Sequence, residues 1–218
     1  MKFFSASTRL TCMLLASAAL GGALTACVPL VVGGAVGTAM VSVDRRTSGT
    51  QLEDERIELR ASNNISAQLG DSAHVNVTSW NRQVLLTGEV ATATDRGKLD
   101  QIAQGVENVR GVVNETVVAP PSSFTQRSND TYITSKVKAS IVDAKDLTSS
   151  AFKVVTERGV VYLMGRVTQR EATRATEIAR GVGGVTKVVR VFEVISEDEL
   201  KRGFADPQQP APVVRDAQ

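Results

Sequence analysis

The chain has 218 residues, of which 42% are hydrophobic and 22% are charged, and its formal net charge is +2. This composition is ordinary for a globular protein of one or two small domains, and the nearly neutral charge argues against a general nucleic-acid binder. Both cysteines, Cys12 and Cys27, lie in the N-terminal apolar stretch, so we expect no C-x-x-C motif and no disulfide within the folded part.

The N-terminus has the pattern of a secretory signal. Lys2 and Arg9 supply positive charge, an uncharged apolar run covers residues 10–23, and "LTAC" (24–27) places small residues before a cysteine. This pattern resembles the lipobox of bacterial lipoproteins. The resemblance implies cleavage before Cys27 and acylation of Cys27, which would anchor the protein to a membrane.

An uncleaved transmembrane anchor is the alternative, because the uncharged run continues to Val43 and residues 10–43 could span a bilayer. Pro29 and several glycines make this stretch a poor uninterrupted helix, so we favour the lipoprotein. Val28, rather than Asp, follows the cysteine. By analogy with enterobacterial sorting, this favours the outer membrane, with the protein facing the periplasm.

The rest of the chain contains an internal repeat. "VLLTGEV" (84–90) recurs as "VYLMGRV" (161–167), and "IAQGVENVRGVV" from Ile102 recurs as "IARGVGGVTKVV" from Ile178. Upstream, apolar residues spaced by four recur in both copies, which places them on one face of a helix. Identity in periodic segments with small length changes in loops indicates a duplicated fold.

Each copy predicts a helix, two strands, a second helix and a final strand. The fold class is therefore α+β: two tandem αββαβ modules, each a small three-stranded mixed sheet with two helices on one face. Because cores of this size are marginal, we expect the modules to pack together. The predicted elements include helices at 54–68 and 130–144, the second capped at Asn129 or Asp130, and final strands at 112–118 and 188–195.

The predicted domain organisation follows from these elements and from composition. A tail rich in Pro and Gln is expected to be disordered. The boundaries are a signal peptide at 1–26, a lipidated Gly-rich linker at 27–50, a first module at 51–119, a connector at 120–127, a second module at 128–196 and the tail at 197–218.

The two modules, the strand–glycine signature at Gly88 and Gly165, "SNDTYITSKVKASI" (128–141) and the lipobox together resemble the dual-BON outer-membrane lipoproteins. This resemblance implies a non-enzymatic protein that binds anionic phospholipid and supports outer-membrane integrity and cell division. It also implies that the first helix of the second module contacts lipid through an aromatic residue near its start. The matching aromatic here is Tyr132, where relatives carry Trp.

The charge distribution independently favours the second module as the lipid-binding one, because its basic residues outnumber its acids while the first module is acidic. Tyr132 is predicted about 140° from the apolar stripe of its helix, so it points outward beside Lys136. Packing of Tyr132 against the first module or the linker is the alternative. The candidate phospholipid-binding residues are Tyr132, Ser135, Lys136 and Ala139.

No catalytic constellation is visible. His74, the one histidine, has no nucleophile placed near it by a motif, and we interpret it as a surface-loop residue. No acidic cluster has metal-ligand spacing, so no metal or other cofactor is expected. The expected partner is membrane anionic phospholipid and not nucleic acid. An envelope protein–protein adaptor, whose module surfaces dock a protein partner, is the second hypothesis.

Overall fold

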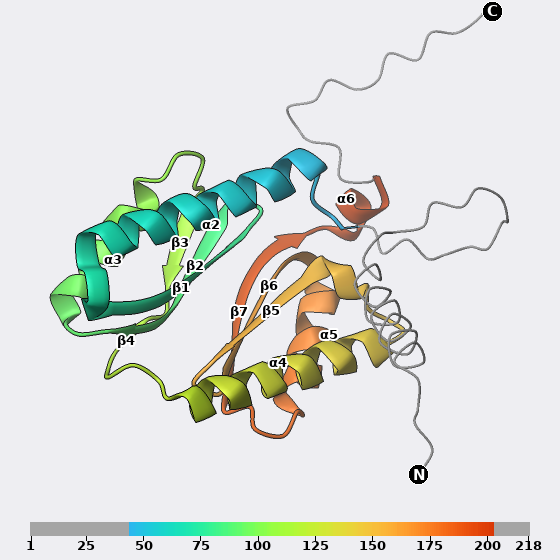
Figure 1. Ribbon diagram of the computed structural model, residues 1–218. Helices are drawn as coiled ribbons and strands as arrows, with labels where there is room; N and C mark the ends of the chain where they lie inside the picture. The colour runs from blue at the N-terminus through green and yellow to red at the C-terminus, as the bar shows by residue number, and fades with distance from the viewer. Residues whose placement is uncertain (1–43, 203–218) are drawn as a thin grey trace, which may run out of the picture. The chain divides into compact units, whose positions relative to one another are not determined.

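The computed structural model describes residues 44–202, which contain two mixed β-sheets, each covered by helices (Figure 1). None of the helices within 44–202 is both long and apolar enough to cross a membrane. The signal, Cys27 and most of the linker lie outside the described residues. The first module contains α2 (Ser48–Leu69), the short 3-10 helix η2 (Gly70–Ser72), β1 (Ala73–Trp80), β2 (Gln83–Val90), α3 (Ala93–Gln104), β3 (Gly111–Asn114) and β4 (Val117–Val118).

The first sheet has four strands rather than the predicted three. β1 pairs antiparallel with β2, and both β3 and β4 pair parallel with β2. The single strand predicted at 112–118 is broken because the Asn114 side chain accepts hydrogen bonds from the backbone N–H and the hydroxyl of Thr116, at 3.1 and 2.5 Å. This local turn interrupts the ladder between the two short strands.

The second module has the predicted three-stranded mixed sheet, with β5 antiparallel and β7 parallel to the central β6. The tail prediction was wrong at its start, because 197–202 form a helix. Acidic residues in its first turn and basic residues in its last turn complement the helix dipole. The elements are α4 (Phe124–Asp143), η3 (Ser149–Ala151), β5 (Phe152–Glu157), β6 (Val160–Thr168), α5 (Gln169–Arg180), β7 (Lys187–Ile195) and α6 (Glu197–Arg202).

α4 begins well before the predicted cap at Asn129 or Asp130. Its N-cap is Ser123, which forms a capping box with Gln126. Asp130 instead lies inside the helix, where its buried carboxylate accepts hydrogen bonds from the backbone N–H groups of Arg158 and Gly159, both at 2.8 Å. Asp130 therefore fixes the β5–β6 hairpin and not the start of the helix.

The first module repeats this arrangement. Buried Asp54 accepts hydrogen bonds from the N–H groups of Asn81 and Arg82 in the β1–β2 turn, at 2.9 and 2.7 Å. Both turn residues have positive φ, 51° and 65°, as two-residue hairpins of this twist require. The same contact in both modules supports the duplication inferred from the sequence.

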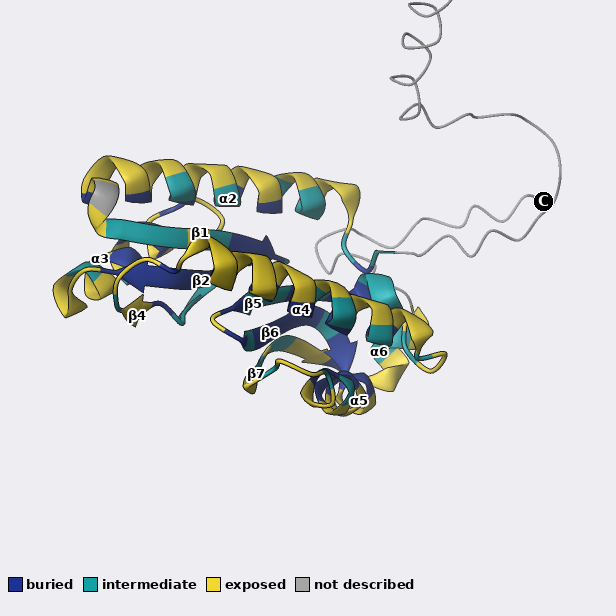
Figure 2. Cartoon of the chain, turned by 60° about the horizontal axis from the view of Figure 1, so that its bottom comes forward, coloured by how far each residue is buried: buried dark blue, intermediate teal, exposed yellow. Residues whose placement is uncertain are grey.

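Each module has its own apolar core between its helices and one face of its sheet. The helices turn their buried residues toward the sheet and their exposed residues outward (Figure 2). The apolar stripes expected from the repeat are confirmed as core. They are Ile57, Ala61 and Ile65 in α2, and Ile133, Val137 and Ile141 in α4.

A third cluster lies between the two sheets, on the faces that the helices do not cover. Because side chains alternate along a strand, Leu85 points away from the helices that Val84 and Leu86 face. Leu85 packs with Trp80 of the first module and with Tyr162 and Met164 of the second. All described residues accordingly belong to one compact unit, as the expectation that the modules pack together requires.

Candidate functional site

The outward side of α4 carries large apolar side chains in the open. Phe124 is 78% exposed, Tyr132 is 62% exposed and Val142 is 64% exposed. At about 100° per residue, Phe124 and Val142 point in the same direction and Tyr132 lies about 80° from it. Exposed Ser135 and Ala139 lie between these directions. These five residues, here called the outer face of α4, run along about 27 Å of helix at roughly 1.5 Å per residue.

The sequence predicted four phospholipid-binding residues on α4, and three of them belong to this outer face while Lys136 does not. Tyr132, Ser135 and Ala139 are exposed on one side of the helix. Lys136 lies on the flank, where its Nζ donates a hydrogen bond to the carbonyl oxygen of Gly183 and sits 4.6 Å from the centre of the Tyr132 ring. Lys136 therefore holds the ring against the module rather than reaching outward.

Sequence reasoning missed Phe124, Lys138 and Val142. Lys138 has no ion-pair partner among residues 44–202 and lies on the flank opposite Lys136, about 40° from Phe124 around the helix axis. The capping-box pattern Ser123-x-x-Gln126 would have extended the predicted helix back to Phe124. Lys138 also stands beside a shallow pocket of about 210 Å³, lined by Lys138, Ile141, Val142, Ser149, Ser150, Phe152 and Val154.

The matching helix of the first module has a different surface. Its arginines are engaged within the module, Arg56 with Glu53 at 3.7 Å and Arg60 with Glu107 at 3.0 Å. Leu59 is 63% exposed but has no aromatic neighbour on that side of α2. The two modules thus share a fold and a core but not an outer helix surface.

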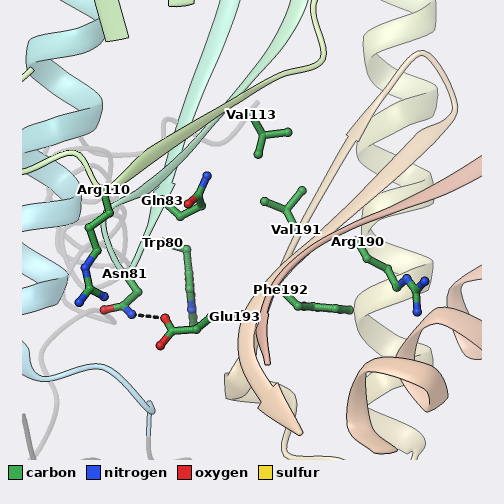
Figure 3. Close-up of a pocket in the computed structure, with 10 residues that line it drawn as sticks. Trp80, Asn81, Gln83, Arg110, Val113, Arg190, Val191, Phe192 and Glu193 are labelled. Atoms are coloured by element: carbon green, nitrogen blue, oxygen red, sulfur yellow. Dashed lines mark hydrogen bonds between the residues drawn. The ribbon is translucent and has the colours of Figure 1, made fainter. Parts of the chain in front are cut away.

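A groove of about 490 Å³ runs beside the inter-sheet cluster (Figure 3). Trp80 lines it, and the buried indole Nε1 of Trp80 has no hydrogen-bond partner among residues 44–202. Asn81 donates a hydrogen bond across the groove to Glu193 at 2.5 Å, and the side chain of Arg190 points away from Trp80. Gln83, Arg110, Val113, Gly165, Val191 and Phe192 complete the lining.

His74 is not the surface-loop residue that the sequence suggested. It lies in β1, where its Nδ1 is 3.0 Å from the carboxylate of buried Glu89. Arg158 of the second module donates to the other oxygen of Glu89 at 3.0 Å. Burial alone would raise the pKa of Glu89, but the hydrogen bonds from Arg158 and His74 outweigh it and lower the pKa below 4.5. Within the described range, no group of three or more His, Cys, Asp or Glu side chains could hold a metal ion.

The modules correspond to a known domain family. A family model described as the BON domain matches residues 53–120 and again residues 129–196. Together these matches cover more than half of the chain. The chain therefore belongs to the BON-domain family and carries two BON domains.

Comparison with individual proteins places it among dual-BON proteins of the DolP type. It is 38% identical to the outer membrane lipoprotein DolP of Haemophilus influenzae over 79% of this chain and 90% of that protein. It is 36% identical to the 21 kDa hemolysin of Actinobacillus pleuropneumoniae over 70% of this chain and 80% of that one. A solved structure of CdsD, a structural protein of the type III secretion system of Chlamydia trachomatis, matches 65% of this chain and 95% of its own at 11% identity, with a TM-score of 0.28.

Proposed function

We propose that this chain is a non-enzymatic lipoprotein of the outer membrane that faces the periplasm and binds anionic phospholipid through its second BON domain. Its two modules are then copies of one αββαβ unit, at 51–119 and 128–196, on a lipidated linker that begins at Cys27. The lipobox in the sequence and the similarity to an outer membrane lipoprotein support the anchor. We further propose that it supports outer-membrane integrity and cell division, as the family resemblance implies.

The observation that carries the lipid proposal is the exposed apolar row on the outer face of α4. Phe124, Tyr132 and Val142 would enter the headgroup layer, where an amphipathic helix lies with its apolar side down. Lysines near an anionic surface add about 1 kcal/mol each. Lys138, which has no partner among residues 44–202, is the cation best available to a phosphate, whereas Lys136 is held by Gly183.

Vesicle flotation tests the row directly. Tyr132→Ala removes interfacial apolar area at roughly 25 cal/mol per Å², so binding to phosphatidylglycerol-containing vesicles should weaken by about 1–2 kcal/mol, or 5- to 30-fold. Phe124→Ala should act in the same direction. The matched control is Leu59→Ala, which removes an equally exposed side chain from α2 and should leave binding unchanged. Parent-like binding by both α4 variants would exclude this face.

The two lysines give a second, independent comparison. Lys138→Glu should weaken vesicle binding, and the loss should be greater at low salt because screening removes electrostatic attraction. Lys136→Met should also weaken binding, through the freed Tyr132 ring, and because it introduces no negative charge its effect should depend less on salt. Equal salt dependence of the two variants would contradict this division of roles.

The anchor has its own test. Mass spectrometry of the mature N-terminus should find an acylated Cys27, and Cys27→Ser should abolish fractionation with outer membranes. An intact N-terminus that begins at Met1 would favour the transmembrane alternative.

A protein adaptor is the second candidate function, favoured by the groove beside Trp80 and by the acidic first module. In that case Arg110→Glu in the groove would reduce capture of an envelope protein, while Tyr132→Ala would not. Unchanged binding of the parent protein to anionic and zwitterionic vesicles alike would favour this candidate over lipid binding.

A further inference from the structure

The residues just before α2 bind both modules at once. Arg45 extends into the second module, where its guanidinium donates to both carboxylate oxygens of Glu171 at 2.7 and 2.6 Å. The same group donates to the carbonyl oxygen of Arg166 at 2.9 Å. Both Arg45 and Glu171 are buried, so this is a desolvated, two-pronged contact rather than a surface ion pair.

The next residue does the same in the first module. Arg46 donates to buried Asp54 at 2.8 Å and stacks on the Trp80 ring, 3.6 Å from its centre. Asp54 is also the carboxylate that fixes the β1–β2 turn. The consecutive side chains of Arg45 and Arg46 therefore bind different modules. Asp44 orients the Arg46 side chain by accepting hydrogen bonds from it.

Few other contacts fix the direction in which the two sheets meet. The inter-sheet cluster is apolar, and apolar burial favours contact without favouring one orientation. Beyond it, Asn76 donates to Glu157 and Arg158 to Glu89, each at 3.0 Å, and Asn81 donates to Glu193 at 2.5 Å. Interfaces between domains of one chain commonly permit relative motion. A directional contact between the two modules would therefore restrict their relative orientation.

We propose that residues 44–47 are a clamp that holds the two BON domains in one orientation. The clamp stands on its own contacts and does not depend on the lipid proposal. Its place in the sequence gives it a consequence: residues 27–43 lead directly into it from Cys27. A pulling force on residues 27–43 would therefore act on both domains through residues 44–47, rather than on α2 alone.

Trp80 lies in the cluster between the two sheets, is the one tryptophan in the sequence and is 7% exposed, so its fluorescence reports on how the two modules pack. Arg45 contacts the second module and is not the residue stacked on Trp80, so Arg45→Met leaves the immediate surroundings of the indole unaltered. If the clamp holds the joint, acrylamide should quench Trp80 several-fold more strongly in full-length Arg45→Met than in the parent. Far-UV circular dichroism should stay unchanged, because each module keeps its own core.

A second variant guards against simple unfolding. Arg45→Met leaves Glu171 buried without its cation, whereas Arg45→Met with Glu171→Gln removes the buried charge and keeps the side-chain oxygen that accepts from the Thr168 N–H at 2.9 Å. This double variant should also show increased quenching, while Arg60→Met, which removes a surface pair with Glu107, should not. Parent-like quenching in the folded double variant overturns the clamp. Loss of folding in the double variant also overturns it, because residues 44–47 would then be required for folding rather than for orientation.

Discussion

Gly88 and Gly165 occupy equivalent positions in β2 and β6, and the backbone explains why glycine stands at both. Their φ angles are 109° and 157°, a region that side-chain-bearing residues rarely adopt. A Cβ at Gly88 would lie 2.1 Å from the carbonyl oxygen of His74, and one at Gly165 would lie 2.2 Å from that of Ala151. Because the obstructing atoms are backbone carbonyls, in β1 for Gly88 and at the end of η3 for Gly165, no side-chain movement can relieve the clash.

We therefore expect Gly88→Ala and Gly165→Ala each to lower the free energy of unfolding by about 3 kcal/mol, in the range of severe single substitutions. Gly97→Ala in α3 is the control, since nothing lies within 4 Å of its Cβ position. Replacing a helical glycine there should stabilise by roughly 0.5–1 kcal/mol. Urea unfolding of the three variants measures these differences, and equal stability of all three would contradict the backbone argument.

Replacement of Glu157 is predicted to stabilise the protein, in contrast to replacement of the two strand glycines. It is buried, and burial raises its pKa above 4.5 despite a hydrogen bond from Asn76. A carboxyl whose pKa is raised on folding destabilises the native state as pH rises through that range, because the folded protein must give up a proton that it holds more tightly. Glu157→Gln should therefore raise the melting temperature at pH 7 but not at pH 4. A lower melting temperature at pH 7 would mean that the charge itself is stabilising.

At the scale of elements, the two long helices have separate caps that can be removed one at a time. Ser123 caps α4 and Thr47 caps α2, each through its side-chain oxygen. Loss of such a cap costs typically about 1 kcal/mol. Phe124 lies in the first turn of α4, so loss of the Ser123 cap disturbs a residue of the proposed lipid-binding face. The first turn of α2 contains no residue of that face.

Ser123→Ala and Thr47→Ala should thus lower the free energy of unfolding by similar amounts, about 1 kcal/mol each. Only Ser123→Ala should weaken binding to anionic vesicles, because fraying of its helix moves Phe124. Thermal melting together with vesicle flotation separates the two effects. Weakened vesicle binding in both variants would attribute the loss to general instability.

The elements also show where periodicity is informative. The four-residue spacing of Ile133, Val137 and Ile141 correctly predicted the buried stripe of α4, since a stripe is a property of the helix alone. It did not predict the start of α4, because the residues from Phe124 onward are exposed and contribute no apolar period. The break between β3 and β4 was also missed, because it depends on the hydrogen bond from the Thr116 N–H to the Asn114 side chain, which periodicity does not report.

At the scale of the whole described molecule, two buried carboxylates join its parts. Glu89 accepts from Arg158 across the modules, and Glu171 accepts from Arg45 of the clamp. Burial alone would raise the pKa of Glu171, but the hydrogen bonds from Arg45 and from the Thr168 N–H lower it below 4.5, as for Glu89. A carboxyl whose pKa is lowered on folding stabilises the fold at pH values above its pKa in the unfolded chain. This contribution is lost as the pH falls through its pKa in the folded protein.

The full chain should therefore lose stability as the pH falls below about 4, with Trp80 becoming more accessible to acrylamide in the same range. Glu89→Gln and Glu171→Gln should each be less stable than the parent at pH 7 and show a smaller further loss on acidification. Asp146→Asn, which removes an exposed pair with Arg174, is the control and should follow the parent. An acid transition unchanged in both Gln variants would exclude these two carboxylates as its cause.

The sequence by itself determined the features that depend on neighbouring residues. The duplication, the α+β class, the core stripes of both first helices and the two strand glycines could all be read from local spacing. Tertiary structure decided what distant residues do to one another. It directed Lys136 toward Gly183, left Phe124 exposed on the outer face of α4 and Lys138 exposed on the flank beside it, and buried Glu89 against the second module. It also brought Arg45 to Glu171, a contact between residues far apart in sequence whose charges give no local pattern. Such pairs form only when folding has removed water from both partners, so the sequence alone carries no sign of which charges will meet.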